Sequence, residues 1–507
     1  GLTKEDMNKK FSVQGKIEGI KQTGGPTLFT LFDGSGTLTI KGFISAGARA
    51  YPEINEDDVV TALVEIIEHE GVMEGEIIRI QKLATDQQDV FAQRLQKILY
   101  ERSRPDNVGF LIQSPILDKL APKIDDAVIT IKMAIADNRP IILKHHADTD
   151  GYSAGMTLQR AILPLIAAQH NDEKSMWLYY KRTPSKSPYY DYFDATRDIG
   201  HSLSDNAKYN QKMPLIIIVD TGSGEEDALP IRKVKLFGCQ VVVIDHHVPG
   251  KNDPISKLAD VHINPHLVGD EYSYSAGMLC TEVARKINQK AENIDYIPAL
   301  SGLADRIESP ELEQYLKIAQ DRGYSREFLE RLGIVIDFEA WNFKFDESRE
   351  LVDILFGSDK ELQRKSVELL YPEIMSRFAR QLDISRNNCE IKTVGKVLLA
   401  KLDIGAHSNF NTYPPAGKSL SSLHDWVQKE HPGKPVLSIG YAEDFVTIRA
   451  TDGTDFSIIE FVDRVQKKFP FGGIDGGGHA HAGSIKAIPS MMPKILVEFE
   501  NVLAGRQ

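Results

Sequence analysis

Short strand-like stretches between turn signals dominate the first 83 residues. They are rich in β-branched and aromatic residues, and glycine-rich turns at residues 24–26 and 33–36 separate them. The stretches lie at residues 11–20, 27–32, 37–43 and 59–68. About five short strands in such a length predict a small β-barrel over residues 1–83.

From residue 139 the pattern changes to short apolar runs without alternation. They lie at residues 140–143, 215–219 and 241–244, with helical stretches such as 154–168 between them. Such runs are typical of strands buried on both faces of a parallel sheet, and their alternation with helices predicts a doubly wound α/β domain. Residues 84–138 have helical periodicity, and we assign them to the same domain as its first helices. This domain therefore spans residues 84–305.

The rest of the chain predicts two further parts. Residues 306–388 are charged, with apolar positions at helical spacing, and predict an all-helical insertion. Residues 389–507 return to a mixed α/β pattern. We therefore expect a multidomain α/β protein with an N-terminal barrel, a parallel-sheet domain carrying a helical insertion, and a C-terminal α/β domain.

Composition narrows the class of protein. Cys239, Cys280 and Cys389 lie far apart, which argues against a disulfide scaffold or a thiolate zinc site and favours a cytoplasmic location. No apolar run approaches the roughly 20 residues that span a bilayer, and the first residues lack a signal-peptide core. The net charge of −12 disfavours non-specific duplex binding. It does not exclude a phosphate substrate, because metal-binding carboxylates contribute to it.

Aspartate follows each of the three apolar runs, and a histidine pair accompanies it after two of them. The sequences are HHADTDG at 145–151, DTG at 220–222 and DHH at 245–247, and a further acid, Asp305, lies in GLADRIE. Ligands of parallel sheets bind at the carboxyl ends of the strands, so these side chains are expected to meet at one edge. A single Asp after a strand usually caps a helix, but capping does not explain three such clusters together.

Carboxylates and imidazoles in this combination favour Mn²⁺ or Mg²⁺ over metals that prefer thiolates. Clustered carboxylates repel one another unless cations lie between them. The set offers enough ligands for two cations about 3.5–4 Å apart, the arrangement that activates water for phosphodiester hydrolysis. Two divalent cations, Mn²⁺ first and Mg²⁺ second, are therefore the expected cofactors.

The same sequences resemble the motifs of the DHH phosphoesterase superfamily, and in particular archaeal RecJ-like single-strand exonucleases of the GINS-associated type. HADTDG, VDTG, VIDHH and GLADR match the four motifs in order, and INPH at 263–266 is similar to a RecJ segment. GGGHAHAGS at 476–484 is similar to the glycine-histidine motif of the companion DHHA1 domain. The resemblance covers about residues 139–305 and 389–500.

The resemblance implies a set of metal ligands: His146, Asp148, Asp150, Asp220, His246 and Asp305. Asp148 and Asp150 would bind separate cations, and Asp220 would bridge them. The RecJ motif begins with Asp where this chain has His146, and His145 could take its place, so the choice between the two histidines stays open. Asp245 would orient a histidine, and His247 would face the scissile phosphate.

The C-terminal motif supplies candidate substrate-binding residues. Gly476, Gly477 and Gly478 would let backbone N–H groups approach a phosphate closely. His479 and His481 would touch the phosphate or the base, and Arg449 is a further candidate for a phosphate contact. The alternative is a glycine-rich tight turn with core histidines.

Two segments bear on the substrate. LFTLFDGSGTLTIKGF resembles the second and third strands of an OB-fold, a common single-strand-binding module, although a generic barrel for docking is the alternative. YYKRTPSKSPYY at 179–190 interleaves tyrosines with cations, as single-strand binders do, although a solvated loop with half-buried tyrosines is favoured.

The expected function is degradation of single-stranded nucleic acid in replication or repair, on DNA from the 5′ end and also on RNA. One alternative is an oligoribonuclease or cyclic-dinucleotide phosphodiesterase, and another is a non-catalytic replication scaffold. The resemblance also implies that residues 306–388 bind replication proteins such as GINS, and no membrane partner is expected.

Overall fold

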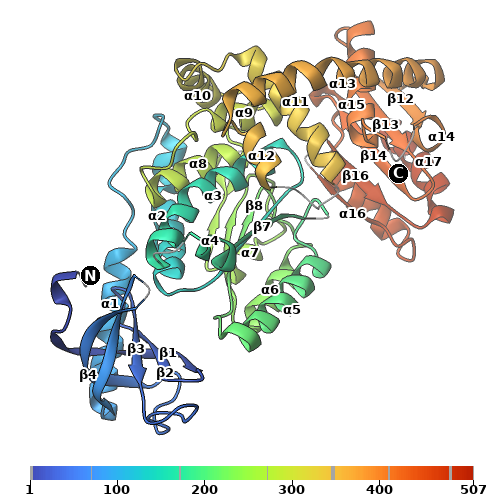
Figure 1. Ribbon diagram of the computed structural model, residues 1–507. Helices are drawn as coiled ribbons and strands as arrows, with labels where there is room; N and C mark the ends of the chain where they lie inside the picture. The colour runs from blue at the N-terminus through green and yellow to red at the C-terminus, as the bar shows by residue number, and fades with distance from the viewer. Residues whose placement is uncertain are drawn as a thin grey trace. The chain divides into compact units, whose positions relative to one another are not determined.

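The computed structural model describes residues 4–69, 71–170, 173–185, 187–270, 272–343, 349–408, 412–478 and 482–505. The chain forms two compact units, residues 1–326 and residues 327–507 (Figure 1). The first unit contains a barrel and a parallel sheet, and the second contains a long helix and a mixed sheet. Among the described residues, no helix is both long and apolar enough to cross a membrane.

The N-terminal strands form a closed barrel in the order β1-β2-β3-β5-β4. Strands β3 and β5 pair in parallel and the other neighbours pair antiparallel. Its core includes Phe29, Ile40 and Val64, which are fully buried. The strands are β1 (Lys10–Gln22), β2 (Thr27–Phe32), β3 (Thr37–Gly42), β4 (Val59–His69) and β5 (Val72–Lys82). The prediction of a small N-terminal barrel is confirmed.

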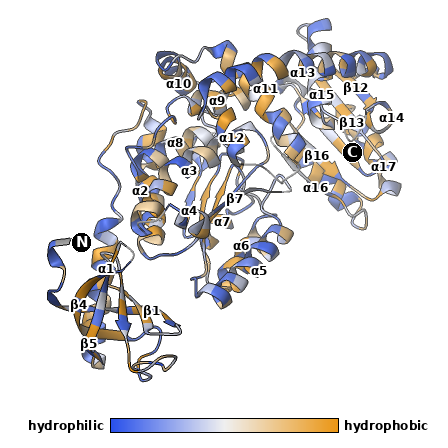
Figure 2. Ribbon diagram, viewed as in Figure 1, coloured by the Kyte–Doolittle hydropathy of each residue, from blue (hydrophilic) through white to orange (hydrophobic). Residues whose placement is uncertain are grey.

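The central sheet has five parallel strands in the order β10-β9-β8-β6-β7. Its strands are apolar on both faces, and Figure 2 shows them in orange between helices of mixed colour. The strands are β6 (Ile141–His145), β7 (Tyr180–Pro184), β8 (Leu215–Val219), β9 (Gln240–Ile244) and β10 (Val261–Ile263). The three apolar runs of the sequence are the three central strands, so the prediction of a parallel-sheet domain is confirmed.

Helices cover both faces of this sheet. One face packs against α5 and α6, where Ile142, Ile216 and Val241 share a core cluster with Ile199 and Val234. The helices α2, α3, α8 and α9 pack against one another, with α3 touching β6 and α8 touching β9. The helices of this unit are α1 (Thr85–Arg102), α2 (Pro115–Ala136), α3 (Thr149–His170), α4 (Ser175–Tyr179), α5 (Tyr192–Tyr209), α6 (Ala228–Leu236), α7 (Ile255–Leu258), α8 (Ala276–Ile287), α9 (Ile297–Ala304) and α10 (Pro310–Asp321).

In its described part, the segment predicted as a helical insertion contains helices joined by short turns and no strand. It contains α10, followed by α11 (Arg326–Phe343), α12 (Arg349–Leu355) and α13 (Lys360–Asn388). The division between the two units falls after Arg326, inside this segment. The domain boundaries placed at residues 83, 305 and 388 stay predictions.

The C-terminal sheet has six strands in the order β11-β12-β13-β14-β16-β15, with β12 and β13 parallel and the other neighbours antiparallel. The strands are β11 (Glu390–Val394), β12 (Val397–Asp403), β13 (Val436–Tyr441), β14 (Phe445–Ala450), β15 (Asp475–Gly478) and β16 (Ala482–Lys486). The helices around it are α14 (Ile404–His407), α15 (Ala416–Glu430), α16 (Ile458–Lys468) and α17 (Met492–Leu503). The prediction of a C-terminal α/β domain is confirmed.

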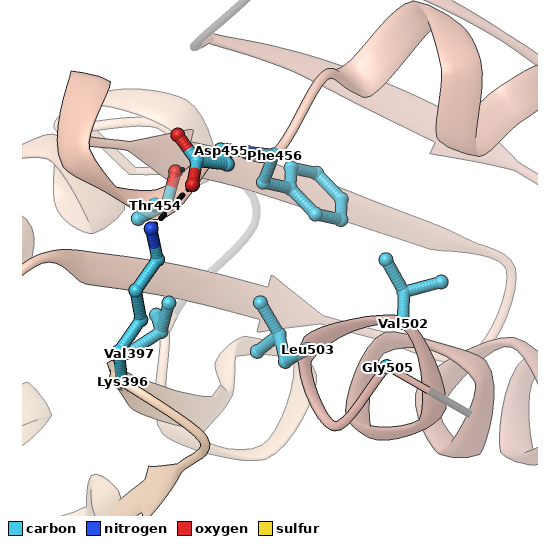
Figure 3. Close-up of a pocket in the computed structure, with 8 residues that line it drawn as sticks. All are labelled: Lys396, Val397, Thr454, Asp455, Phe456, Val502, Leu503 and Gly505. Carbon is cyan, nitrogen blue, oxygen red and sulfur yellow. Dashed lines mark hydrogen bonds and ion pairs between the residues drawn. The ribbon is translucent and has the colours of Figure 1, made fainter.

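A small pocket of about 210 Å³ lies between β12 and the end of α17 (Figure 3). Val397, Phe456 and Leu503 are among its apolar lining residues, and Lys396 pairs with Asp455 at its rim. None of the motif residues lines it. The pocket therefore offers no chemistry that bears on the sequence motifs.

A buried ion-pair network joins the central sheet to α5. Lys144 on β6 places its Nζ 3.1 Å from Asp194 Oδ1 and 3.3 Å from Asp198 Oδ1, with all three side chains shielded from solvent. Tyr190 donates its hydroxyl to Asp198 at 3.2 Å. The charge on a buried lysine is tolerated only because these carboxylates face it.

We expect Asp194→Ala to destabilise the first unit by about 3 kcal/mol, because it removes one of the two carboxylates that compensate a buried charge. The matched control is Glu313→Ala, which removes an exposed ion pair with Arg326 in the same unit and should cost about 1 kcal/mol or less. Scanning calorimetry of both variants measures the difference. Equal melting temperatures for the two variants would contradict the role given to the network.

Candidate metal centre

The first motif follows β6 directly. His146 and Asp148 lie in the turn after the strand, and Asp150 lies in the first turn of α3. Asp148 Oδ1 accepts a hydrogen bond from the backbone N–H of Gly151 at 3.0 Å, which fixes this turn. A Cβ at Gly151 would lie 2.2 Å from the carbonyl oxygen of His146, so only glycine fits there.

Asp220 directly follows β8 and has an unusual backbone conformation. Its φ is 56°, in the left-handed region that non-glycine residues rarely adopt, and its N–H donates to the carbonyl oxygen of Ile244 at 3.1 Å. Such strained residues concentrate at functional sites, where the surrounding structure holds them in place. The adjoining strand β9 leads into Asp245, His246 and His247, so the second and third motifs lie side by side.

The motif residues converge into three overlapping groups of possible metal ligands. The first group contains His146, Asp148 and Asp220, and the second contains Asp150, His246 and Asp305. The third, Asp220, Asp245, His246 and His247, overlaps the other two, and hydrogen bonds from neighbouring donors occupy its Asp245, so we take the first two as the ligand groups. Within each group the ligand atoms lie within 4.8 Å of one another.

The carboxylate of Asp220 faces both groups. Its Oδ2 lies 3.6 Å from His146 Nδ1, and its Oδ1 lies 3.3 Å from His246 Nε2. His246 Nε2 is also 3.6 Å from Asp150 Oδ2 and 3.5 Å from Asp305 Oδ2. The geometry therefore allows Asp220 to contribute one oxygen to each of two neighbouring cations.

The electrostatics of the cluster fit divalent cations. Burial, followed by the charge of Asp220, raises the pKa of Asp150 well above its usual range. Burial also raises the pKa of Asp305 to about 6, although the charge of His246 opposes the rise. Asp220 Oδ2 is buried and has no hydrogen-bond partner among the described residues. Bound cations would stabilise the charged form of carboxylates whose pKa values are raised in this way. They would also provide a partner for the buried oxygen that has no hydrogen-bond donor.

Asp150 is held in place by the beginning of α8. Its two carboxylate oxygens accept hydrogen bonds from the backbone N–H groups of Ala276 and Gly277, both at 2.8 Å. The hydroxyl of Ser301 also donates to it. The N-terminus of a helix favours a negative charge, so this arrangement orients Asp150 toward His246. Ser301 and the start of α8 belong to no sequence motif, so no signal in the sequence identified them.

Asp245 holds the third motif together. It accepts hydrogen bonds from His247 Nδ1 at 2.8 Å and from the backbone N–H groups of Ser223 at 3.0 Å and His246 at 2.8 Å. Its oxygens are therefore occupied by donors. The histidine side chain that it orients is His247, whose ring is about one-third exposed.

Asn264 is a further supporting residue, to which the sequence motifs assigned no role. Its Nδ2 donates to the carbonyl oxygen of His247 at 2.8 Å and to Ser223 Oγ at 3.0 Å. Ser223 Oγ also lies 3.0 Å from His262 Nε2. Asn264 belongs to the INPH sequence, so the resemblance at 263–266 was the signal that could have identified it.

The structure separates the two histidines of the first motif. His145 is fully buried at the end of β6, packs its ring against Tyr152, and lies with Nδ1 2.6 Å from the carbonyl oxygen of His146. Burial, together with the charge of Arg182, lowers the pKa of His145 well below its usual value. His146 lies 2.8 Å from Asp148. His146, and not His145, thus stands in the first ligand group.

The C-terminal candidates lie in the second unit. Gly476, Gly477 and Gly478 form β15, an edge strand paired with β16, rather than a tight turn. A Cβ at Gly476 would lie 2.8 Å from the carbonyl oxygen of Ser484, so the close pairing requires glycine there. His479 and His481 lie outside the described residues.

Arg449 makes its contacts within the second unit. Its Nε donates to Ser421 Oγ at 3.0 Å, and its Nη1 donates to the carbonyl oxygen of Ile448 at 2.7 Å. These bonds hold the side chain against the first turns of α15. A phosphate contact by Arg449 stays a prediction.

We expect Asp220→Asn to weaken Mn²⁺ binding in both ligand groups, by at least about a hundredfold. Loss of a residue that only supports a ligand typically lowers metal affinity about 10–100-fold. Asp220 faces both ligand groups directly, so its loss should lower the affinity at least as much. Asp148→Asn should weaken one group only. The measurement is a Mn²⁺ titration followed by electron paramagnetic resonance, with Asp126→Asn, an exposed acid on α2, as the control. Two unchanged Mn²⁺ sites in Asp220→Asn would contradict the shared ligand.

Comparison with known proteins finds a family match over the part of the chain that contains the ligand groups. Residues 140–305 match the sequence profile of the DHH family, N-terminal domain. The chain is 36% identical over 527 aligned residues to the uncharacterized protein MJ1198 of Methanocaldococcus jannaschii, covering 98% of this chain and 69% of that protein.

Solved structures show the same fold. The DHH domain of a protein described as belonging to a family of ribosomal proteins has a TM-score of 0.79 at 34% identity, covering 84% of this chain and all of that chain. RecJ from Thermus thermophilus, in complex with Mn²⁺, has a TM-score of 0.54 at 16% identity, covering 82% of this chain and 59% of that chain. This chain belongs to the DHH family of phosphoesterases.

Proposed function

We propose that this protein is a metal-dependent exonuclease that hydrolyses the phosphodiester bonds of single-stranded nucleic acid, with DNA degraded from its 5′ end and RNA as a second substrate. The observation that carries the proposal is the position of Asp220, whose two oxygens face two groups of ligands. A family of phosphoesterases and a fold similar to RecJ support the same class of reaction.

Each residue of the cluster has a distinct task in this proposal. His146 and Asp148 would hold one cation, Asp150, His246 and Asp305 would hold the other, and Asp220 would contribute to both. Such cations would supply an activated water and stabilise negative charge on the phosphate.

His247 would bind the phosphate of the substrate. Because Asp245 accepts the hydrogen bond from its Nδ1, the ring of His247 is held in a fixed orientation. Asn264 fixes the backbone of the same residue. Asp245 and Asn264 are therefore positioning residues, and His247 is the residue that would touch the substrate.

Two features favour single strands over other phosphodiesters. The N-terminal barrel has the five strands of an OB-fold, whose members bind single-stranded nucleic acid. A net charge of −12 disfavours non-specific binding to duplexes. A dinucleotide phosphodiesterase would not need the barrel, and a non-catalytic scaffold would not need the complete set of acids.

Binding of GINS or other replication proteins by residues 306–388 stays a prediction.

We expect the wild type, with Mn²⁺, to release mononucleotides from one end of single-stranded DNA or RNA, and Asp220→Ala and His246→Ala to lose at least about a hundredfold of this activity. Gel analysis of strands labelled at either end gives the rate and the polarity. Asp126→Ala serves as the control, and circular dichroism verifies folding. Faster turnover of dinucleotides than of long strands would support the phosphodiesterase alternative. Normal turnover in His246→Ala would contradict the ligand assignment.

Asp245→Asn should reduce kcat about 10–100-fold, because the amide disturbs the hydrogen bonds that hold His247. Mn²⁺ binding should change much less than in Asp220→Asn, since Asp245 would not bind the cations. Steady-state kinetics and the Mn²⁺ titration together separate these effects. A loss of Mn²⁺ as large as that of Asp220→Asn would instead make Asp245 a ligand.

A further inference from the structure

The segment that leads into α5 lies at the edge of the sheet that carries the metal ligands. Strands β7 and β8 run in parallel with the same central strand, so the loops after them leave the sheet at the same edge. The hydroxyl of Thr221 donates to the carbonyl oxygen of Pro188 at 3.1 Å, and Thr221 directly follows Asp220. The N–H of Tyr190 donates to Asp227 Oδ1 at 2.7 Å, which fastens the segment to the loop after β8.

The tyrosines and the arginine that the sequence suggested for single-strand binding are mostly unsuited to it. Tyr180, Arg182 and Tyr190 are almost completely buried, and Lys186 lies outside the described residues. Tyr190 instead belongs to the network around Asp198. The favoured alternative, a solvated loop with half-buried tyrosines, is also wrong for these side chains, because residues 180–184 form strand β7 and both tyrosines are buried.

The next two aromatic residues are different. Tyr192 is 53% exposed and Phe193 is 55% exposed, at the first two positions of α5. Each has a cation over its ring: Lys233 Nζ lies 3.7 Å from the ring centroid of Tyr192, and Arg197 Cζ lies 5.8 Å from that of Phe193. Two adjacent exposed rings with a cation on each are not required by the packing of α5.

We propose that Tyr192 and Phe193, with Lys233 and Arg197, form an aromatic platform on which bases of a single strand stack while its end occupies the metal centre. The inference rests on the proposed function and deepens it by naming a binding surface for the polymer. Base stacking on aromatic rings combined with cations near the phosphates is how single strands are bound without regard to sequence. The positive charges match a polyanion, although the chain as a whole is acidic.

The position of the platform fits a strand that reaches the metal centre. Pro188, which Thr221 contacts, is four residues before Tyr192, and four residues of chain span at most about 14 Å. The rings thus lie within a few nucleotides of Asp220. Lys233 lies over one face of the Tyr192 ring, and about half of that residue is exposed to solvent.

The test is the affinity for a labelled oligothymidylate of about twelve nucleotides, a length typical of one single-strand-binding module. Fluorescence anisotropy in EDTA prevents cleavage during the measurement. Tyr192→Ala should weaken binding roughly tenfold, and the double variant with Phe193→Ala should weaken it further. The matched control is Tyr209→Ala, at the opposite end of the same helix, where the ring is also exposed.

A strand of the same length without bases identifies what the platform contacts. Wild type and double variant should bind this abasic strand equally, because no base is present to stack. If the double variant binds oligothymidylate within twofold of wild type, or loses as much affinity for the abasic strand, the proposal is wrong. Unchanged binding of oligothymidylate would instead indicate that these rings contact a protein partner.

A second measurement keeps this proposal separate from the proposed function. In Mn²⁺, the ratio of KM for oligothymidylate to KM for a dinucleotide should rise about tenfold in Tyr192→Ala, because the dinucleotide is too short to reach the rings. No hydrolysis of either substrate by the wild type would overturn the proposed function. Hydrolysis with an unchanged KM ratio would overturn the platform alone.

Discussion

The structure of the metal centre depends on one carboxylate shared by two groups of ligands. Asp220 can face both because β8 lies between β6 and β9, and because its backbone adopts a left-handed conformation at the end of the strand. An L-residue rarely occupies that conformation, so the surrounding structure must stabilise it. The hydrogen bond from its N–H to Ile244 ties this strained residue to the strand that carries the third motif.

Supporting residues around the cluster hold its side chains in fixed orientations. The N–H groups at the start of α8 orient Asp150, and Asp245 and Asn264 fix His247 through its ring and its backbone. Carboxylates this close together repel one another, so orientation by fixed donors is needed before cations bind. The network around Lys144 secures the neighbouring strand β6 to α5, and α5 presents the aromatic platform at the same edge.

Several features could be predicted from the sequence because their signals are local. Buried parallel strands appear as continuous apolar runs, and the barrel strands are short β-branched and aromatic stretches separated by turns. The fold class therefore followed from patterns of a few residues. Asp148, Asp220 and His246 could be grouped in advance because each follows a strand of one sheet. The edge strand at residues 476–478 was not foreseen as a strand, since glycine runs usually indicate turns and its pairing with β16 is a tertiary contact.

The kinds of residue that meet at the edge of the sheet follow from the amino-acid sequence, because parallel strands bring the residues that follow them to one edge. Their directions and burial follow from the packing of distant elements. This packing directed His146 toward Asp148 and buried His145, it recruited Ser301 and Asn264 from segments far along the chain, and it exposed Tyr192 while burying Tyr190. Side-chain direction and burial depend on packing between distant elements, and no local pattern of residues specifies them.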